Sequence, residues 1–313
     1  MKPIPRAPVP SEFLITVHFY MHSYMLQYSH MKNGGSYMKR IVTIQDISCV
    51  GKCSLTVALP IISATGVEAA IIPTAVLSTH TMFKNFTCKD LDDQILPIAE
   101  HWKNEGLTFD AFYTGYLASA QQIAKVITLI EELKSENSLV IIDPAMADNG
   151  KLYPTFDEAF PQEMAKLCAI ADIVLPNITE ACYLTGTPYQ AEYDETFAKR
   201  ICRKLAAQGA KKVVLTGALF DGKYGVLLFD SIADSFYFYQ QKKIDATYHG
   251  TGDIFSSAFT GALVRGAEME ESVRVAADYT AECIRVTRED PDSCWYGVNF
   301  ESAIPYLLRR INA

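Results

Sequence analysis

From Met38 onward, the chain alternates between short apolar runs and longer segments in which apolar residues recur at helical spacing. This alternation is typical of a mostly parallel β-sheet that is covered by helices on both faces, and it predicts a three-layered α/β fold. The predicted strands are 40–45, 69–74, 109–114, 139–143, 173–175 and 212–216. The predicted helices between them are 54–65, 91–105, 120–135, 157–169, 180–184 and 192–208.

The later part of the pattern completes a single predicted domain, residues 38–313. No internal repeat, low-complexity tract or Gly/Ser-rich linker interrupts it. An antiparallel hairpin is predicted at 224–230 with 235–239. Two helices, 253–265 and 272–287, are predicted to finish the chain, and a small strand flap is predicted at 75–86.

Residues 1–37 differ from the rest of the chain. Four prolines lie among the first ten residues, and an apolar stretch at 13–28 is interrupted by polar side chains. The stretch lacks a clean small-residue cleavage site and is too short and broken for a membrane span. We therefore expect a mobile N-terminal extension, with the functional domain beginning at Met38.

Composition limits the partners of this chain. Of its 313 residues, 49% are hydrophobic and 20% are charged, and the net charge is −8 without any Lys/Arg-rich block. We therefore expect no extended nucleic-acid or membrane surface, whereas a local phosphate pocket is compatible with this charge. The eight cysteines are scattered, and Cys49 and Cys53 lack a second pair at zinc-finger spacing. They indicate reduced thiols in a cytoplasmic protein.

The most informative motif is Gly250-Thr251-Gly252-Asp253, at the start of the predicted helix 253–265. The first N–H groups of a helix lack an intrahelical partner and carry partial positive charge, and two glycines let a phosphate approach closely. Asp253 would repel that phosphate, unless it takes the proton from a hydroxyl group that attacks it. An aspartate that merely satisfies the helix dipole is the structural alternative.

Polar residues follow the predicted strands, at the sheet edge where open α/β folds bind ligands. Acids that gather there beside a phosphate-binding helix indicate Mg²⁺-nucleotide chemistry, because a hard cation takes oxygen ligands and neutralises the repulsion. The residues are Asp46 and Ser48, Ser78-Thr79-His80-Thr81, Gly115-Tyr116, Asp143 and Asp148, Asn177 and Glu180, and Thr216-Gly217.

Several of these residues also have a structural explanation. Asp143 could be an ordinary turn residue, and Asn177 with Glu180 has the spacing of a helix-capping pair. Tyr116 could be a packed aromatic, and His80 could donate to a backbone carbonyl. These structural explanations do not account for the convergence of the acids and the anion site on one edge of one sheet.

A Walker-type phosphate loop is excluded at Gly51-Lys52-Cys53-Ser54. That loop needs a glycine five positions before its second glycine, where this chain has Asp46. It also needs a serine or threonine directly after the lysine, where this chain has Cys53.

Gly250-Thr251-Gly252-Asp253 resembles the signature of the ribokinase-like superfamily. The resemblance runs from Met38 to the C-terminus and implies a ribokinase-like three-layer sandwich with a mostly parallel central sheet. The segments that resemble the pyridoxal (pyridoxine, pyridoxamine) kinase branch are Ile44-Gln45, Ser78-Thr79-His80-Thr81, Thr114-Gly115-Tyr116-Leu117, Asp143-Pro144 and Pro176-Asn177-Ile178-Thr179-Glu180.

The resemblance implies that Asp253 deprotonates a hydroxymethyl group while the Gly250 and Gly252 amides hold the transferring phosphoryl group. It also implies ATP as phosphate donor, Mg²⁺, a monovalent cation such as K⁺, and a homodimer. The implied substrate contacts are His80, Thr81 and Tyr116; the implied Mg²⁺ group is Asp143, Asp148, Asn177 and Glu180; and the implied nucleotide contacts are Asp143, Thr216, Thr251 and Gly252.

Asp46 departs from the branch, which commonly has serine there. Beside the presumed ring pocket, its carboxylate could accept a hydrogen bond from a protonated pyridine nitrogen. Alternatively it points to solvent or pairs with nearby Lys52. Residues 230–249, which should cover the nucleotide, match no motif of the branch.

These features predict ATP-dependent phosphorylation of the 5′-hydroxymethyl group of pyridoxal, pyridoxine or pyridoxamine, with no nucleic-acid or membrane partner. The main alternative is a hydroxymethylpyrimidine kinase of thiamine synthesis, because its ring and alcohol are alike. A sugar or nucleoside kinase is the next alternative. A catalytically inactive ligand-binding relative is disfavoured by the retention of Asp253 with both glycines.

Overall fold

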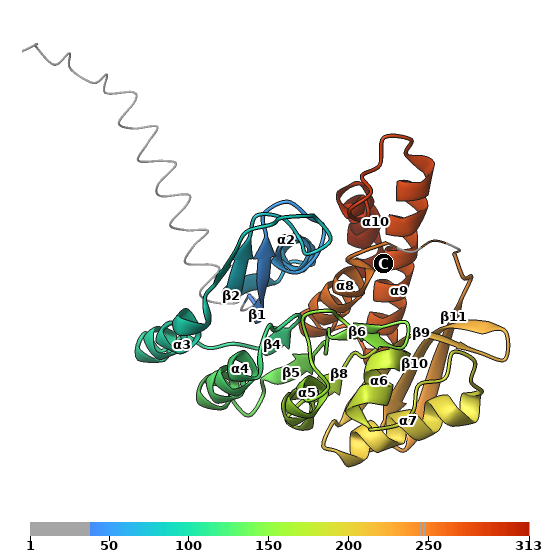
Figure 1. Cartoon of the computed structure of the whole chain (residues 1–313), viewed down its shortest axis with the longest axis horizontal. Helices are drawn as coiled ribbons and strands as arrows, with labels where there is room; N and C mark the ends of the chain where they lie inside the picture. The colour runs from blue at the N-terminus through green and yellow to red at the C-terminus, as the bar shows by residue number, and fades with distance from the viewer. Residues whose placement is uncertain (1–37, 245, 247, 313) are drawn as a thin grey trace, which may run out of the picture. The chain divides into compact units, whose positions relative to one another are not determined.

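The computed structural model describes residues 38–244, 246 and 248–312, and the predicted extension 1–37 lies outside them. Nine strands of the described residues form one sheet in the order β11-β10-β9-β8-β5-β4-β1-β2-β3 (Figure 1). The pairings from β2 through β1, β4, β5 and β8 to β9 are parallel, and β3, β10 and β11 add antiparallel pairings at the two ends. The predicted mostly parallel sheet is confirmed.

The sheet strands are β1 Arg40–Ser48, β2 Glu68–Leu77, β3 Cys88–Asp90, β4 Ala111–Thr114, β5 Leu139–Ile142, β8 Ile173–Val174, β9 Lys212–Phe220, β10 Lys223–Asp230 and β11 Ser235–Gln241. A separate two-stranded hairpin consists of β6 Ala147–Asp148 and β7 Lys151–Leu152.

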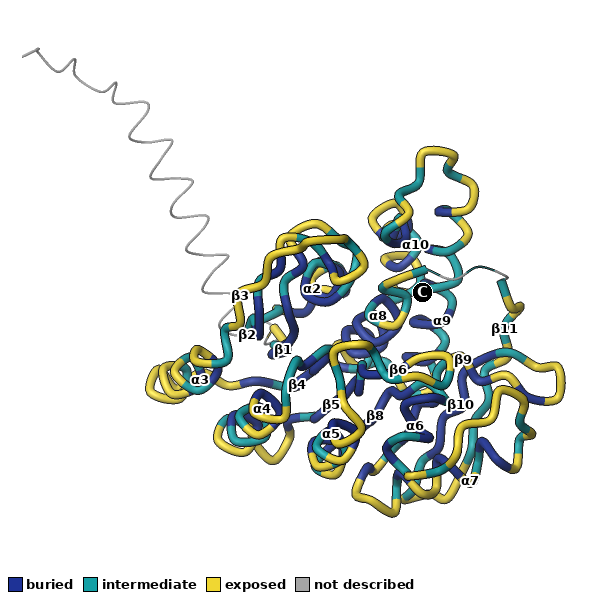
Figure 2. The backbone as a smooth tube through the Cα atoms, in the orientation of Figure 1, coloured by how far each residue is buried: buried dark blue, intermediate teal, exposed yellow. Residues whose placement is uncertain are grey.

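Helices cover both faces of the sheet, as predicted (Figure 1). Successive residues of a strand point to opposite faces, so Val42 and Ile142 pack in one core while Ile41 and Ile141 pack in the other. Both faces of the central strands are therefore buried, as Figure 2 shows by colour. No described helix is both long and apolar enough to cross a bilayer.

One helical layer consists of α3 Ile95–Asn104, preceded by the short turn η1 Asp92–Gln94, with α4 Ala120–Leu133, α5 Phe160–Ala169, α6 Ile178–Leu184 and α7 Glu195–Ala207. The other layer consists of α2 Leu55–Ala64, α8 Thr251–Arg265, α9 Met269–Glu289 and α10 Phe300–Ile311.

Helix α10 corrects the prediction that helix 272–287 finishes the chain. Pro305 lies inside α10, and an internal proline lowers helix propensity strongly. The helix forms because Phe300, Ala303 and Leu307 bury one face against the core, and such packing outweighs propensity.

The predicted flap at 75–86 is also corrected. Its strand residues are the end of β2, Ala75 to Leu77, and they pair antiparallel with β3 beyond the predicted segment. Residues 78–87 form the connection. All three residues of β3 are exposed, so no apolar run marks this short edge strand.

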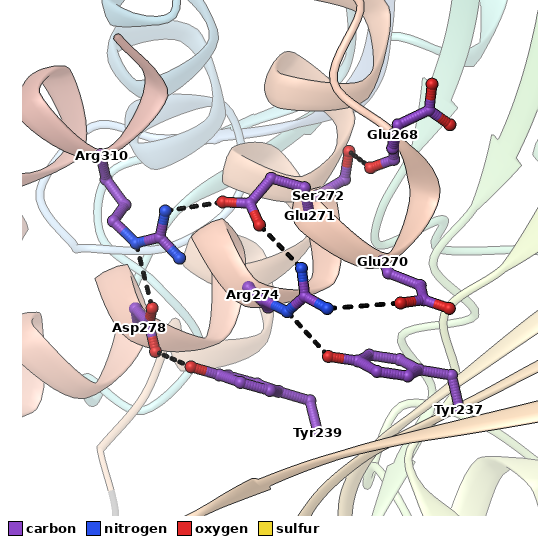
Figure 3. A network of polar contacts seen from close by, with 9 residues as sticks. All are labelled: Tyr237, Tyr239, Glu268, Glu270, Glu271, Ser272, Arg274, Asp278 and Arg310. Carbon is purple, nitrogen blue, oxygen red and sulfur yellow. Dashed lines mark hydrogen bonds and ion pairs between the residues drawn. The ribbon is translucent and has the colours of Figure 1, made fainter. Parts of the chain in front are cut away.

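A network of polar side chains joins the edge strand β11 to α9 and α10 (Figure 3). Asp278 of α9 accepts hydrogen bonds from the Tyr239 hydroxyl at 2.7 Å and from Arg310 of α10 at 3.2 Å. Arg274 of α9 donates to the Tyr237 hydroxyl at 2.8 Å. The network therefore anchors β11, whose outer edge has no strand neighbour in the sheet order.

Asp278→Ala is expected to lower the free energy of unfolding by about 1–3 kcal/mol, because it removes the acceptor shared by the half-buried Tyr239 hydroxyl, the Gln241 amide and Arg310 Nε. Glu289→Ala is the matched control on the same helix, since it removes an exposed pair with Arg285. Urea unfolding measures both variants. Equally small losses would show that the network does not stabilise β11.

Candidate active site

The N-terminus of α8 forms the centre of the candidate site. Its N-cap, Gly250, has a φ of 79°, and a Cβ built on it would lie 1.8 Å from the Lys52 carbonyl oxygen. Both the left-handed backbone and this contact therefore require glycine. Apart from its chain neighbours and the backbone of its own helix turn, no atom of the described residues lies within 4 Å of a Cβ built on Gly252. Gly252 thus leaves open space beside the free N–H groups of the first turn, as an anion site needs.

Asp253, in the first turn of α8, is held by a different loop. Its Oδ2 accepts a hydrogen bond of 2.9 Å from the backbone N–H of Ser54, which follows β1. Ser54 has a φ of 51°, an uncommon conformation for a residue with a side chain. The carboxylate is half-buried, so it is oriented from one side and still reaches the surface.

Asp253 and Asp143 influence each other electrostatically. Burial raises the pKa of Asp253 to about 6; the Ser54 hydrogen bond opposes this shift and the Asp46 charge adds to it. Asp143 follows β5, and burial together with the Asp253 charge raises its pKa as well. Ser256 of α8 donates to Asp143 Oδ2 at 2.7 Å. Helix α8 therefore contributes one carboxylate and orients the other.

Asp46 lies at the carboxyl end of β1 and is only 5% exposed. Ser48 Oγ donates to its Oδ2 at 3.1 Å, and burial raises its pKa despite hydrogen bonds from Ser54 and Ser48. The alternative in which Asp46 points to solvent or pairs with Lys52 is wrong. Lys52 Nζ instead lies 2.9 Å from Glu301 Oε2.

Tyr116 follows β4, the parallel neighbour of β1, and lies near enough to Asp46 for the Asp46 charge to affect its pKa. Ile44 pairs with Thr114, and Asp46 and Tyr116 each follow by two positions. The Tyr116 hydroxyl is 3.1 Å from Thr155 Oγ1. Burial raises its pKa, the Thr155 contact opposes the shift, and the Asp46 charge adds to it. The two predicted substrate residues therefore lie in the same region of the sheet edge.

His80 is buried and uses both ring nitrogens within the protein. Nδ1 accepts from the Met82 N–H at 3.1 Å, so Nε2 carries the proton and donates to the Tyr296 carbonyl at 3.1 Å. Burial lowers its pKa; the Tyr296 contact opposes this, and His249 adds to it. The backbone-carbonyl alternative is thus the observed arrangement. Thr81 is exposed, and substrate contact by either residue stays a prediction.

Asn177 and Glu180 form the helix-capping pair that the spacing allowed. Asn177 Oδ1 accepts from the Glu180 N–H at 2.9 Å, and Glu180 Oε2 accepts from the Asn177 N–H at 2.8 Å. Glu180 Oε1 accepts from the Met146 N–H at 3.2 Å, and Asn177 Nδ2 donates to the Ala147 carbonyl at 2.8 Å. Burial, with the Asp143 charge adding to it, raises the pKa of Glu180 well above its usual range. The pair therefore fixes the segment after β5.

Asp148 is exposed in the β6–β7 hairpin, and its two oxygens accept from the N–H and the side-chain amide of Asn149 at 2.8 and 2.9 Å. Within the described part of the chain, no three His, Cys, Asp or Glu side chains come together to hold a metal ion. The predicted acids do not, by themselves, make a closed metal site.

Besides Asp143 and Gly252, the predicted nucleotide contacts are Thr216 of β9 and Thr251 at the start of α8. Thr216 of β9 bridges to Asn177, and its hydroxyl donates to the Pro176 carbonyl at 3.3 Å. The Thr251 hydroxyl donates to the Tyr248 carbonyl at 3.3 Å. Each oxygen keeps lone pairs that can accept a further hydrogen bond.

Three residues near the acids were missed in the sequence. Ser54 and Ser256 donate to Asp253 and Asp143, and Tyr153 has a pKa raised by burial and by the surrounding acids. Ser256 follows Asp253 by three positions, so helical spacing places it on the same side and could have revealed it. The Ser54 contact depends on a positive φ that no sequence pattern indicates.

The three-layer sandwich, with acids beside the N-terminus of α8, is the architecture expected of a ribokinase-like kinase. The family model of the phosphomethylpyrimidine kinases matches residues 58–293. The chain therefore belongs to the phosphomethylpyrimidine kinase family, within the pyridoxal kinase branch of the ribokinase-like superfamily.

Individual relatives cover most of the chain. The pyridoxine/pyridoxal/pyridoxamine kinase of Bordetella avium is 30% identical over 278 residues, 83% of this chain and 89% of that protein. The pyridoxine kinase of Bacillus subtilis is 31% identical over 196 residues, 58% of this chain and 66% of that protein. A Bacteroides thetaiotaomicron structure, provisionally named a phosphomethylpyrimidine kinase and crystallised with pyridoxal, has a TM-score of 0.82 at 34% identity and covers 87% of this chain and 96% of its own.

Asp253→Asn is expected to stabilise the protein at pH 8 but not at pH 4. The folded-state pKa of about 6 lies above the ordinary value of 3.8, so the native state binds more protons between these values. Stability from this group is therefore present at low pH and is lost as pH rises through about 6. Asparagine cannot ionise and still accepts from Ser54.

Urea unfolding of both proteins at pH 4 and pH 8 measures this effect. After discounting for the exposed part of the carboxylate, we expect the variant to gain about 1–2 kcal/mol at pH 8. The same difference at both pH values would contradict a raised pKa.

Proposed function

We propose that this chain transfers the γ-phosphoryl group of ATP to the 5′-hydroxymethyl group of pyridoxal, pyridoxine or pyridoxamine. The position of Asp253 supports this activity most directly. It is an oriented, half-buried carboxylate in the first turn of a helix whose neighbouring glycine leaves open space. This arrangement places a base and an anion site at one point, as transfer of a phosphoryl group to an alcohol requires.

In this proposal, Asp253 accepts the hydroxyl proton as the alcohol oxygen attacks phosphorus. A carboxylate with a pKa of about 6 is ionised at neutral pH and is more basic than an ordinary aspartate. The Ser54 N–H holds Oδ2, so Oδ1 is assigned to the proton. The free N–H groups at Gly252 would receive the negative charge of the transferring group.

The ring of the substrate is assigned to the edge that Asp46 and Tyr116 form, with the 78–83 loop beside it. The Bordetella avium and Bacillus subtilis relatives, both named for vitamin B6 substrates, support this class of substrate. The Bacteroides structure crystallised with pyridoxal adds support at 34% identity.

Asp143 and Asp148 are assigned to Mg²⁺, together with the ATP phosphates. A bound Mg²⁺ would neutralise phosphate charge, and the desolvated Asp143 carboxylate is a suitable hard ligand. Asn177 and Glu180 would act by holding the 146–147 backbone through their hydrogen bonds. Thr216 and Thr251 are assigned to the nucleotide. The K⁺ requirement, the homodimer and the cytoplasmic location rest on the resemblance and composition.

A hydroxymethylpyrimidine kinase is the second candidate. The matched family is described as phosphomethylpyrimidine kinase, and a relative in Aquifex aeolicus bears the name hydroxymethylpyrimidine/phosphomethylpyrimidine kinase at 26% identity. The catalytic end would be the same for both rings, so only substrate preference separates the two.

A substrate panel tests the proposal. Transfer from ATP·Mg²⁺ to pyridoxal, hydroxymethylpyrimidine and ribose is measured, and we expect the highest kcat/KM with pyridoxal. Asp253→Asn should lower kcat by about 10²–10⁴-fold with little change in the KM for ATP. Because the base must be ionised, kcat/KM of the unmodified protein should fall as pH drops below about 6. A preference for the pyrimidine would establish the second candidate, and transfer to none would indicate an inactive relative.

Asp46→Ser tests the ring contact. If the buried carboxylate accepts a hydrogen bond from a pyridinium nitrogen, serine should weaken pyridoxal binding and shift the pH dependence of kcat/KM, while the KM for ATP stays nearly constant. A pH series of kcat/KM for both proteins provides the measurement. Superimposable profiles would assign Asp46 a purely structural role.

A further inference from the structure

The loop between β1 and α2, residues 51–54, touches the candidate site through its backbone. The Lys52 carbonyl oxygen packs against Gly250, where a Cβ would lie 1.8 Å away. The Ser54 N–H donates to Asp253 at 2.9 Å. A shift of this loop would therefore move both the N-cap contact and the hydrogen bond that orients the carboxylate.

The side chain of Lys52 is directed to the start of α10. Nζ donates to Asn299 Oδ1 at 3.1 Å and forms an ion pair with Glu301 Oε2 at 2.9 Å. It also lies 5.9 Å from the centre of the Phe300 ring. The Lys52 side chain is only 15% exposed, whereas Glu301 is 54% exposed, so the ion pair is open to solvent on the glutamate side and the contact with Asn299 is the more shielded of the two.

The acceptor Asn299 is itself held in place. Its side-chain amide donates to Asp290 Oδ2 at 2.6 Å, and its backbone N–H donates to Thr287 Oγ1 at 2.8 Å. Close packing adds a further constraint, because a Cβ built on Gly297 would lie 2.4 Å from Lys52 Cβ. The start of α10 is therefore a rigid anchor for the lysine.

The same segment holds the loop that carries a predicted substrate residue. Tyr296 accepts the hydrogen bond from His80 Nε2 at 3.1 Å. The rings of Phe83 and Trp295 pack beside it, with centres 4.6 Å apart. Residues 295–301 thus contact both the 51–54 loop and the 78–83 loop.

We propose that Lys52 is a positioning residue, which fastens the 51–54 loop to the start of α10 and thereby sets the position of the Ser54 N–H that orients Asp253. This inference rests on the proposed kinase function. Lys52 resembles a phosphate-loop lysine only in following a glycine, and in this structure its ammonium group binds Asn299 and Glu301. It acts on the reaction through the loop and not through the phosphate.

The kinetic test compares Lys52→Met, Glu301→Gln and the double variant. Methionine keeps an apolar stem beside Gly297 and removes the ammonium group. We expect kcat to fall about 5–50-fold in Lys52→Met with the KM for ATP unchanged, because small displacements of a catalytic group cost rate. Glu301→Gln should lose less, and the double variant should be no slower than Lys52→Met, since both act through one contact.

Lys103→Met is the matched control, because it removes an exposed ion pair with Glu132 outside the site. Its kcat should stay unchanged. Lys52→Arg, which keeps a cation at the same position, should restore most of the rate. If Lys52 only stabilises the fold, Lys52→Met would lower the amount of folded enzyme and leave the kcat per folded molecule unchanged.

A second readout needs no substrate. Cys53 follows Lys52 directly, is half-buried, and has a pKa raised by burial to about 12. Loosening the loop should increase its alkylation by iodoacetamide about fivefold or more in Lys52→Met, measured by peptide mass spectrometry. Cys49 is an exposed reference, and the buried Cys202 reports global unfolding. We expect the increase at Cys53 and not at Cys202.

A raised KM for ATP in Lys52→Met, but not in Glu301→Gln, would overturn the inference and make Lys52 a phosphate ligand. Unchanged kcat together with unchanged Cys53 labelling would also overturn it. If no alcohol is phosphorylated by the unmodified protein, the proposed function fails. In that case, the labelling of Cys53 still shows whether Lys52 fixes the 51–54 loop.

Discussion

The hydrogen bond from the Ser54 N–H to Asp253 joins two segments that are 199 positions apart. It depends on a backbone conformation at Ser54 that costs about 1–3 kcal/mol, and on a glycine at 250 that lets the Lys52 carbonyl approach α8. Packing of α2 and α8 in the same core holds both segments against the sheet. The strain at Ser54 is therefore maintained by tertiary packing, and its effect is to orient the carboxylate at the centre of the site.

The acids of the site oppose one another. Burial raises the pKa values of Asp46, Asp143 and Asp253, and the charge of one raises the pKa of the next. Such a group weakens the fold at neutral pH and favours whatever brings positive charge or a proton to it. Hydrogen bonds from Ser48, Ser54 and Ser256 limit that repulsion without abolishing it. The arrangement is typical of sites in which stability is reduced in favour of ligand binding and proton transfer.

The sheet could be predicted because parallel strands that are buried on both faces appear in the sequence as apolar runs. The edge of the sheet that carries the candidate site could be predicted because polar residues follow those runs. Helix α10 was not predicted because its internal Pro305 interrupts the amphipathic pattern. Strand β3 was not predicted because it is short and exposed. The roles of Asn177, Glu180 and His80 could not be decided from the sequence. The same side chains at the same spacing serve helix capping or a carbonyl contact as well as ligand binding, and only coordinates show which partners are present.

The contact between Lys52 and Glu301 spans 249 positions. Strand β1 lies between β2 and β4, so its neighbours in the sheet are made soon after it, and this part of the protein can assemble early during synthesis. The loop after β1 gains its contacts with Asn299 and Glu301 only after α10 has been synthesised, because these partners lie far along the chain and loop closure over so long a separation comes late. An incomplete chain would already have much of its sheet. If Lys52 positions the 51–54 loop as proposed, the final orientation of Asp253 is reached only when α10 has been synthesised.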